Sequence, residues 1–371
     1  MRILTRDGRT GVDDAFVELP KHVYGDDPHW IPEESRELQG AFSSANDWFE
    51  NGEAMTLCLP GAARLAVFRS HDCCVDGYPA AFFGYWEDVG DPSSSDVLFR
   101  EATAWAREHG AERLYGPIDF TTHGRYRLLL DAEGGARPFV GEPYNPAHYP
   151  MRLESLGFQI ARRYLTQMNT APLRPERIVL ARQALIDAGY TLVPLDGDRW
   201  RSLLPDLKPL TDAIFAQNFA FTHVSYDSFA RGYGETVARR LCPRTSLVAY
   251  GPGGDMAGFV LVYPDYAPLV IQAEGNRRIV PSELSFSEHA AQLERRGERT
   301  GIVRTIGVAP AHRGRGLSHA LGAAVVAAGS AYYDRWIAAL IREDNLSRRF
   351  GDTQPVAVRR YGLYVTSVES P

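Results

Sequence analysis

The sequence predicts an α/β protein of two domains, each with a mixed sheet flanked by helices. Two observations predict this class. A strand–helix–strand order occurs once in each half, and the halves close on similar phrases, IARRYLTQ (160–167) and AVRRYGLY (357–364). The length of 371 residues exceeds one typical domain, and 44% hydrophobic with 23% charged residues is the composition of a globular protein.

The first half predicts a helix, two strands, a second helix and a third strand. Residues 13–23 have amphipathic spacing, and the apolar runs 63–69 and 80–86 predict strands joined by a turn at Gly77-Tyr78-Pro79. The second helix starts after Asp91, a residue type that favours the N-cap, and stops at Gly110. A strand over 112–116 completes the strand–helix–strand unit.

The second half repeats this plan, so we interpret the chain as a duplication. Its predicted elements are, in order, a strand over 190–195, helices over 200–216 and 226–241, strands over 245–250, 257–263 and 301–308, a helix over 317–332 and a strand over 336–341. The segment TAPLRPER holds two prolines and is the natural linker. We therefore predict domains at 1–169 and 178–371, joined by residues 170–177.

Charge and cysteine content exclude several classes of function. A net charge of −6 argues against a general nucleic-acid binder, although six arginines gather between 295 and 315. The four cysteines lack metal-ligand spacing, so we expect no metal site. Neither a signal peptide nor a membrane-length apolar run is evident, which predicts a cytoplasmic protein without a membrane partner. The oligomeric state is left open.

The strand over 301–308 leads into a helix through an unusual loop. Pro310 ends the strand, and Arg313-Gly314-Arg315-Gly316 stands directly before the helix. The first turn of a helix has unpaired N–H groups and a positive dipole end, and glycines let an anion approach the backbone. These features predict a phosphate or pyrophosphate site; the alternative is a plain turn with solvated arginines. Neither a Walker loop nor a dinucleotide fingerprint is present.

This loop resembles the acyl-CoA pyrophosphate loop of the GNAT acetyltransferase superfamily. The match consists of Val308-Ala309-Pro310, Arg313 and Gly316, while Ser318 replaces the usual Gly or Ala. The phrases DPHWIP, FFGYWEDVGDP, ERLYGPID and EPYNPAHYPMRLESLGF also resemble long tandem-GNAT bacterial proteins, over nearly the whole chain. The resemblance implies two GNAT-like domains, each a mostly antiparallel sheet with a central parallel pair. We expect a CoA site in the second half alone, since the acidic start of the helix after Asp91 would repel a pyrophosphate.

The resemblance also implies roles for particular residues. Backbone near Ile306 would polarise the acyl carbonyl, the loop would hold the phosphates, and Asn345 would lie beside the pantetheine arm. The implied cofactor-binding residues are Ile306, Gly307, Val308, Arg313, Gly314, Arg315, Gly316, Leu317, Ser318, Asn345 and Ser347.

The general base and acid are less well marked. Glu343 and Asp344, after a central strand, and Glu283, in a long connecting segment, are candidate bases; the alternative for each is a solvated turn. The tyrosine that many superfamily members carry after the asparagine is missing. Tyr361 and Tyr364 are therefore candidate acids, with core packing as their alternative.

Together these features predict an acyl-CoA-dependent N-acyltransferase, using acetyl-CoA or another acyl-CoA and acting on a small-molecule amine by direct transfer. Two alternatives stay open. In the first, the donor is an aminoacyl-tRNA bound by the same fold, which would require a basic track for the RNA backbone. In the second, the protein binds acyl-CoA without catalysis.

Overall fold

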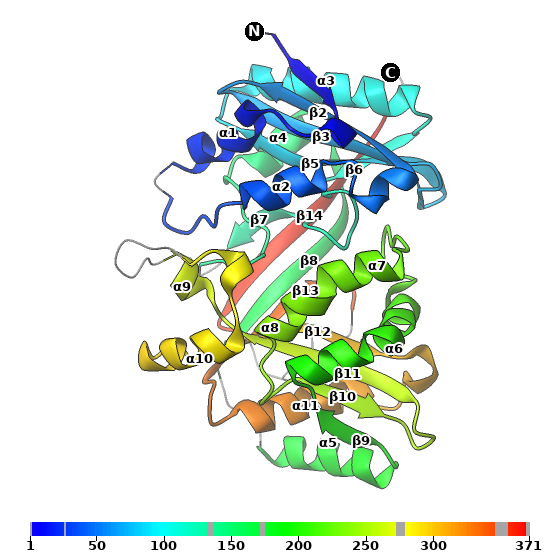
Figure 1. Cartoon of the computed structure of the whole chain (residues 1–371), viewed down its shortest axis with the longest axis vertical. Helices are drawn as coiled ribbons and strands as arrows, with labels where there is room; N and C mark the ends of the chain where they lie inside the picture. The colour runs from blue at the N-terminus through cyan, green and yellow to red at the C-terminus, as the bar shows by residue number, and fades with distance from the viewer. Residues whose placement is uncertain are drawn as a thin grey trace.

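A single 14-stranded sheet runs through the whole molecule (Figure 1). The structure is a computed structural model that describes residues 2–25, 27–132, 137–170, 175–271, 279–345 and 355–368. The strands are β1 (Leu4–Asp7), β2 (Gly52–Leu59), β3 (Ala63–Ser70), β4 (Cys74–Val75), β5 (Tyr78–Asp88), β6 (Arg113–Gly116), β7 (Leu128–Ala132), β8 (Gln159–Thr170), β9 (Thr191–Pro194), β10 (Leu247–Tyr250), β11 (Met256–Pro264), β12 (Thr300–Val308), β13 (Arg335–Arg342) and β14 (Ala357–Ser367).

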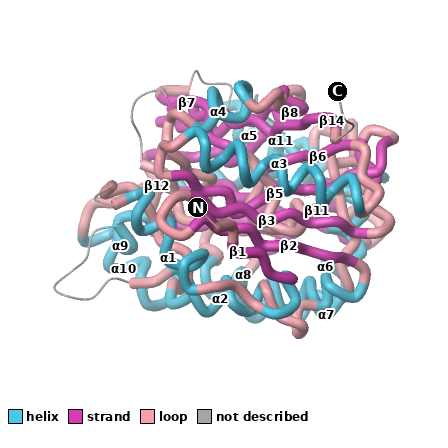
Figure 2. The backbone as a smooth tube through the Cα atoms, turned by 90° about the horizontal axis from the view of Figure 1, so that it is seen from above, coloured by secondary structure: helices cyan, strands magenta, loops and turns pink. Residues whose placement is uncertain are grey.

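Eleven α-helices are defined within the described residues. They are α1 (Asp14–Tyr24), α2 (Ser35–Ala41), α3 (Pro92–Glu108), α4 (Tyr149–Ser155), α5 (Pro175–Asp187), α6 (Gly197–Phe215), α7 (Tyr226–Phe229), α8 (Glu235–Arg240), α9 (Ala267–Ile271), α10 (Phe286–Arg295) and α11 (Leu317–Gly329). Seen from above, α3, α5 and α11 lie on one side of strands β2, β3 and β11, and α1, α2, α6 and α8 lie on the other (Figure 2).

The sheet is mixed in the way the sequence predicts. Its order is β1-β2-β3-β5-β6-β14-β8-β13-β12-β11-β10-β9. Each half has one parallel pair, β5 with β6 and β12 with β13, and the remaining neighbours pair antiparallel. The predicted fold class is therefore confirmed.

The closing strand of each half lies beside the sheet of the other half. β14, at the end of the chain, pairs with β6, while β8 pairs with β13, and β8 and β14 pair with each other. In Figure 1 these two long strands cross the middle of the molecule. The sheet is continuous across the proposed boundary, so the domain limits stay a prediction from sequence.

Apolar side chains fill both faces of each half. In the first half, α3 and α4 pack on one face and α1 and α2 on the other, with Tyr364 and Tyr361 of β14 in the respective cores. In the second half, α5 and α11 cover one face, and α6 and α8 cover the other. This burial is the main driving force for the fold.

Some element limits differ from those expected. β2 was not expected, because Glu53 and Thr56 interrupt its apolar pattern. The turn before β5 lies at Asp76 and Gly77, both at positive φ, so Tyr78 starts the strand. Helix α5 begins at Pro175, within the expected linker, and a π-helical turn at 230–234 divides the expected helix over 226–241.

The described residues contain neither a candidate membrane span nor a candidate metal site. No helix there is long and apolar enough to cross a membrane. In the same part of the chain, no group of three or more His, Cys, Asp or Glu side chains is arranged to hold a metal ion.

Candidate active site

Strands β12 and β13 separate partway along their length. Residues Thr300 to Val303 of β12 pair with Arg335 to Ala338 of β13. Beyond this point β12 continues beside β11, whereas Ile341 and Arg342 of β13 pair with β8. From Arg304 onward, one edge of β12 therefore has no partner strand among the described residues. Such an edge leaves main-chain groups open to a ligand.

The loop after β12 leads to the start of α11 with an open backbone. Gly314 and Gly316 have φ values of 76° and 78°, a region that favours glycine. A Cβ atom added at either position would meet no atom within 4 Å, so the backbone there is open to a ligand. Gly316 is the N-cap of α11, and no side chain caps that helix end. The N–H groups of its first turn are thus available to an anion.

His312 and Arg313 hold this loop in place. The buried His312 has its Nε2 atom 2.7 Å from Asp255 Oδ2 and its Nδ1 atom 2.9 Å from the hydroxyl of Tyr190. Arg313 donates to the carbonyl of Ile214 at 2.8 Å. In this structure the Arg313 guanidinium therefore serves as an anchor, while the side chain of Arg315 is exposed.

A cavity of about 390 Å³ opens beside the gap between β12 and β13. Much of its lining comes from four segments: the loop 122–127 after β6, residues 215–221 at and after the end of α6, Arg304 to Ile306 of β12, and Ala338 to Arg342 of β13. Asn345 reaches its edge. Both halves of the chain thus contribute to one site.

The lining of this cavity is basic and phenolic. It includes Arg125, Arg127, Arg304 and Arg342, together with the tyrosines at 126, 164, 233 and 263. No aspartate or glutamate is among the described residues that line it. Because Arg125 pairs with Glu33 and Asp119, and Arg342 with Asp344, the positive potential of the site comes mainly from Arg127 and Arg304.

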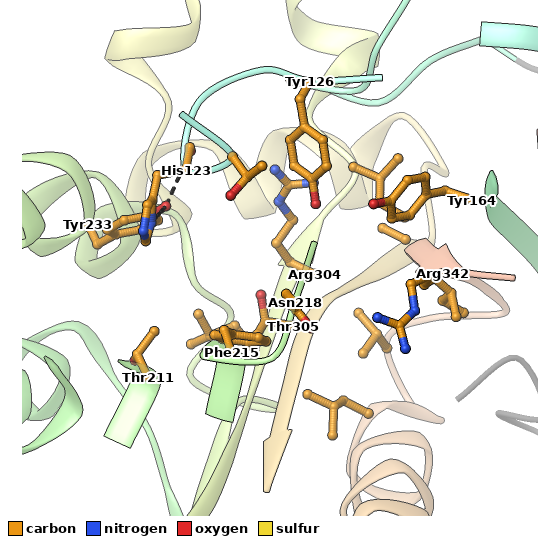
Figure 3. A pocket seen from close by; sticks show the side chains of 18 of the residues that line it. His123, Tyr126, Tyr164, Thr211, Phe215, Asn218, Tyr233, Arg304, Thr305 and Arg342 are labelled. Atoms are coloured by element: carbon orange, nitrogen blue, oxygen red, sulfur yellow. Dashed lines mark hydrogen bonds between the residues drawn. The ribbon is translucent and has the colours of Figure 1, made fainter. Parts of the chain in front are cut away.

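His123 and Tyr233 form a hydrogen-bonded pair in the cavity wall (Figure 3). His123 Nε2 lies 3.0 Å from the carbonyl of Thr222, which can only accept, so this nitrogen carries the proton. Nδ1 then accepts from the Tyr233 hydroxyl at 3.1 Å. Burial lowers the pKa of His123 and raises that of Tyr233 to about 12, so both are neutral at pH 7.

The sequence did not identify this pair. Tyr233 lies in the π-helical turn 230–234, a local distortion often found at functional sites, and His123 comes from the other half. The one sequence signal was the polar-aromatic stretch TTHGRYR directly after a strand of the first half.

The expected bases lie outside the cavity lining. Glu343 and Asp344 follow β13, as expected, but Asp344 pairs with Arg342 and is exposed. The backbone N–H of Glu343 donates to the carbonyl of Arg163 at 3.1 Å. Glu283 ends a short 3₁₀ turn, where its carbonyl accepts from Arg239 at 3.0 Å.

The expected acids also lie away from the cavity. Tyr361 is fully buried and donates to the carboxylate of Glu142, and Tyr364 is buried in the core beneath α3 and α4. This geometry favours the packing alternative for both. Asn345, expected beside the pantetheine arm, borders the cavity, and Ser347, another expected cofactor-binding residue, lies outside the described residues.

The matching gap in the first half is filled by the chain itself. β5 and β6 pair only over Ala80–Phe82 and Arg113–Tyr115. Beyond them, the N–H of Ile118 donates to the carbonyl of Phe83 at 2.7 Å, and Asp119 Oδ1 accepts from the N–H of Tyr85 at 2.8 Å. The edge of β5 therefore has partners where the edge of β12 has none among the described residues.

Helix α3, the counterpart of α11, has a closed start. The Asp91 side chain accepts from the N–H of Ser93 at 3.2 Å and from two serine hydroxyls, and Pro92 occupies the first turn. A carboxylate thus occupies the place where an anion would bind.

Comparison with known proteins bears on the fold. No protein-family model matches the chain. Protein YghO of Escherichia coli (strain K12) is 26% identical over 149 residues. The match covers 39% of this chain and 38% of the length of that relative.

Solved structures match over nearly the whole chain. A tandem GNAT protein from the clavulanic acid biosynthesis pathway matches with a TM-score of 0.51 and 13% identity, covering 100% of both chains. A GCN5-related N-acetyltransferase from Anabaena variabilis has a TM-score of 0.51 and 9% identity, with 99% and 73% covered. A glucosamine N-acetyltransferase region of a fungal β-N-acetylglucosaminidase has a TM-score of 0.50 and 14% identity, with 98% and 38% covered. The chain therefore has the tandem GNAT fold, which confirms the resemblance seen in its motifs.

Proposed function

We propose that this protein is an acyl-CoA-dependent N-acyltransferase that acts on a small-molecule amine. One observation carries the proposal: the uncapped start of α11 lies directly after β12, whose free edge runs into a cavity built by both halves. An acyl-CoA supplies an anionic pyrophosphate and a reactive thioester. The residues present fit both demands, with open N–H groups at Gly316 to Ser318 and an unpaired strand edge from Arg304.

In this proposal the cavity residues control the proton of the acceptor amine. Arginines around an amine disfavour its charged form, so the positive lining lowers its pKa and favours the nucleophilic free base. The Tyr233 hydroxyl, which donates to His123, is placed to accept the amine proton as it passes its own proton to the imidazole. The imidazole is neutral at pH 7 and so has the lone pair that this step requires.

The two alternatives find less support. An aminoacyl-tRNA donor needs a continuous basic track, but the arginines between 295 and 315 are dispersed. Arg304 lines the cavity, Arg313 binds a carbonyl of α6, and Arg299 lies beside Asp334. A non-catalytic binder would not need the hydrogen-bonded Tyr233–His123 pair.

The test is release of free CoA from acetyl-CoA with and without a panel of primary amines. We expect thiol release that depends on one class of amine. Acetyl-CoA binding without release on any amine would favour the binding protein, and absence of acetyl-CoA binding would overturn the proposal.

A further inference from the structure

Two guanidinium groups in the cavity have no carboxylate partner among the described residues. Arg127 is only 8% exposed, and its Nε atom has no hydrogen-bond partner. Its contacts are the hydroxyl of Tyr126 and the rings of Tyr126 and Tyr164, at 3.6 and 4.2 Å from the guanidinium carbon. Arg304 rests against the ring of Phe139 at 5.6 Å. Figure 3 shows its guanidinium pointing across the cavity toward Tyr126.

Two buried arginine clusters nearby do have carboxylate partners. Glu33 accepts from Arg64 at 2.7 Å and from Arg125 at 2.6 Å. Glu142 lies 2.8 Å from Arg359. Arg127 and Arg304 differ from these groups, because neither has a carboxylate partner among the described residues.

An unpaired buried cation such as Arg127 is costly, and a second cation facing the same cavity, Arg304, raises that cost. Burial lowers the pKa of Arg127, and the nearby charge of Arg304 lowers it further. The aromatic rings offset part of this cost through cation–π contact. A bound anion would offset the remainder, and planar guanidinium groups suit a carboxylate, which they bind through paired hydrogen bonds.

We propose that Arg127 and Arg304 form a subsite for a carboxylate carried by the acceptor, so that the acceptor is an amino acid or a similar amine with a carboxylate. The proposal rests on the proposed function and narrows its substrate class. A simple ammonium ion would be repelled by the basic lining. A carboxylate on the same molecule secures binding, while the arginines still favour the neutral amine that attacks the thioester. A cavity of about 390 Å³ has room for such a molecule.

The experiment compares carboxylates with their neutral analogues on the protein saturated with CoA. A panel of amino acids and their carboxamides is titrated by calorimetry. At least one acid should bind on the order of 10- to 100-fold more tightly than its amide, as expected for charged hydrogen bonds. Arg304→Gln should abolish this preference while CoA affinity stays unchanged. Because Arg304 makes no hydrogen bond or ion pair with the described residues, this variant should fold normally.

Two further variants complete the design. Arg127→Gln should also abolish the preference, and Arg36→Gln, which removes an exposed charge outside the cavity, should retain it. Binding of acetyl-CoA and succinyl-CoA is measured in parallel. If succinyl-CoA binds more tightly and loses this advantage in Arg304→Gln, the carboxylate belongs to the acyl chain, and its assignment to the acceptor is overturned.

The proposal is overturned if the CoA-loaded protein shows no preference for acids over their amides. It is also overturned if Arg304→Gln keeps the full preference. A wild-type protein that binds no CoA would instead contradict the proposed function, so the two failures are distinguishable.

Discussion

Tyr164 of β8 and Tyr361 of β14 are direct register partners at the centre of the sheet. They come from the two matching phrases, ARRY and VRRY, so a pseudo-twofold relation between the halves passes between them. Their surroundings differ, however. Tyr164 lines the cavity, whereas the Tyr361 hydroxyl is committed to Glu142. Equivalent residues of the two halves thus have separate tasks, one in the site and one in the core.

The uncapped start of α11 gives the first prediction. Gly316→Asp should abolish CoA binding, because its carboxylate would stand where the pyrophosphate binds. The variant should therefore lose the stabilisation of the folded state by CoA, which is about 2.7 kcal/mol when the CoA concentration is a hundred times its Kd. Thermal denaturation with and without CoA measures this. Gly316→Asn is the control, since asparagine has the same shape and tolerates positive φ. Unchanged CoA affinity in the aspartate variant would exclude this helix end as the phosphate site.

The filled gap between β5 and β6 gives the second prediction. Calorimetry should report one CoA per chain, because Ile118 and Asp119 occupy the edge of β5 and Asp91 caps α3. The Gly316→Asp variant should then bind none. Two equivalent sites per chain would contradict the assignment of distinct roles to the halves.

The base is the subject of the third prediction. Tyr233→Phe removes the hydroxyl that reaches His123, and should lower kcat by about 10²- to 10⁴-fold with CoA affinity unchanged. Glu343→Gln, Asp344→Asn and Glu283→Gln are matched comparisons, and should keep kcat near that of the wild type, since none of the three lines the cavity. A large loss of kcat in one of these three, with Tyr233→Phe active, would return the role to a carboxylate.

The fourth prediction separates packing from catalysis at Tyr361. Glu142→Gln should lower the free energy of unfolding by about 3–5 kcal/mol, because it removes the carboxylate that pairs with the buried guanidinium of Arg359, which is 4% exposed. Tyr361→Phe removes one hydrogen bond and should cost about 1–2 kcal/mol. Urea denaturation measures both. If Tyr361→Phe folds normally yet loses its activity, the tyrosine is the catalytic acid after all.

A buried carboxyl in the first half gives the fifth prediction. Burial raises the pKa of Glu87 from 4.5 to about 7, and the hydroxyls of Tyr24 and Tyr149 donate to it at 3.0 Å. The folded state thus holds a proton that the unfolded chain loses above pH 4.5. Stability from this group is complete below pH 4.5 and declines as the pH rises to about 7.

Glu87→Gln should remove that dependence. The variant should gain stability relative to the wild type between pH 5 and pH 8, by about 3 kcal/mol at most. Urea denaturation at pH 5 and pH 8 measures this difference in the free energy of unfolding. The control is Glu108→Gln, which replaces an exposed glutamate. An equal pH dependence in wild type and Glu87→Gln would show that Glu87 is ionised in the folded protein.

The sequence by itself determined the local elements and the anion loop. Periodicity and turn residues marked most helices and strands, because these patterns depend on neighbours along the chain. The glycines at 314 and 316 were recognisable for the same reason, since a strand, a proline and a helix start adjoin them in sequence. The duplication was readable in the matching phrases, and the structure gives each half the same order of strands.

Tertiary structure alone decided which side chains meet in the cavity. His123 and Tyr233 are 110 residues apart and come from different halves, so no local pattern could pair them. The exchange of β8 and β14 likewise depends on pairing between distant segments. It carries Tyr361 and Tyr364 into the core of the first half and away from the cavity. In the sequence Arg304 was one of six gathered arginines, and nothing singled out Arg127. Their position in one cavity, without a carboxylate partner among the described residues, is what gives them a role.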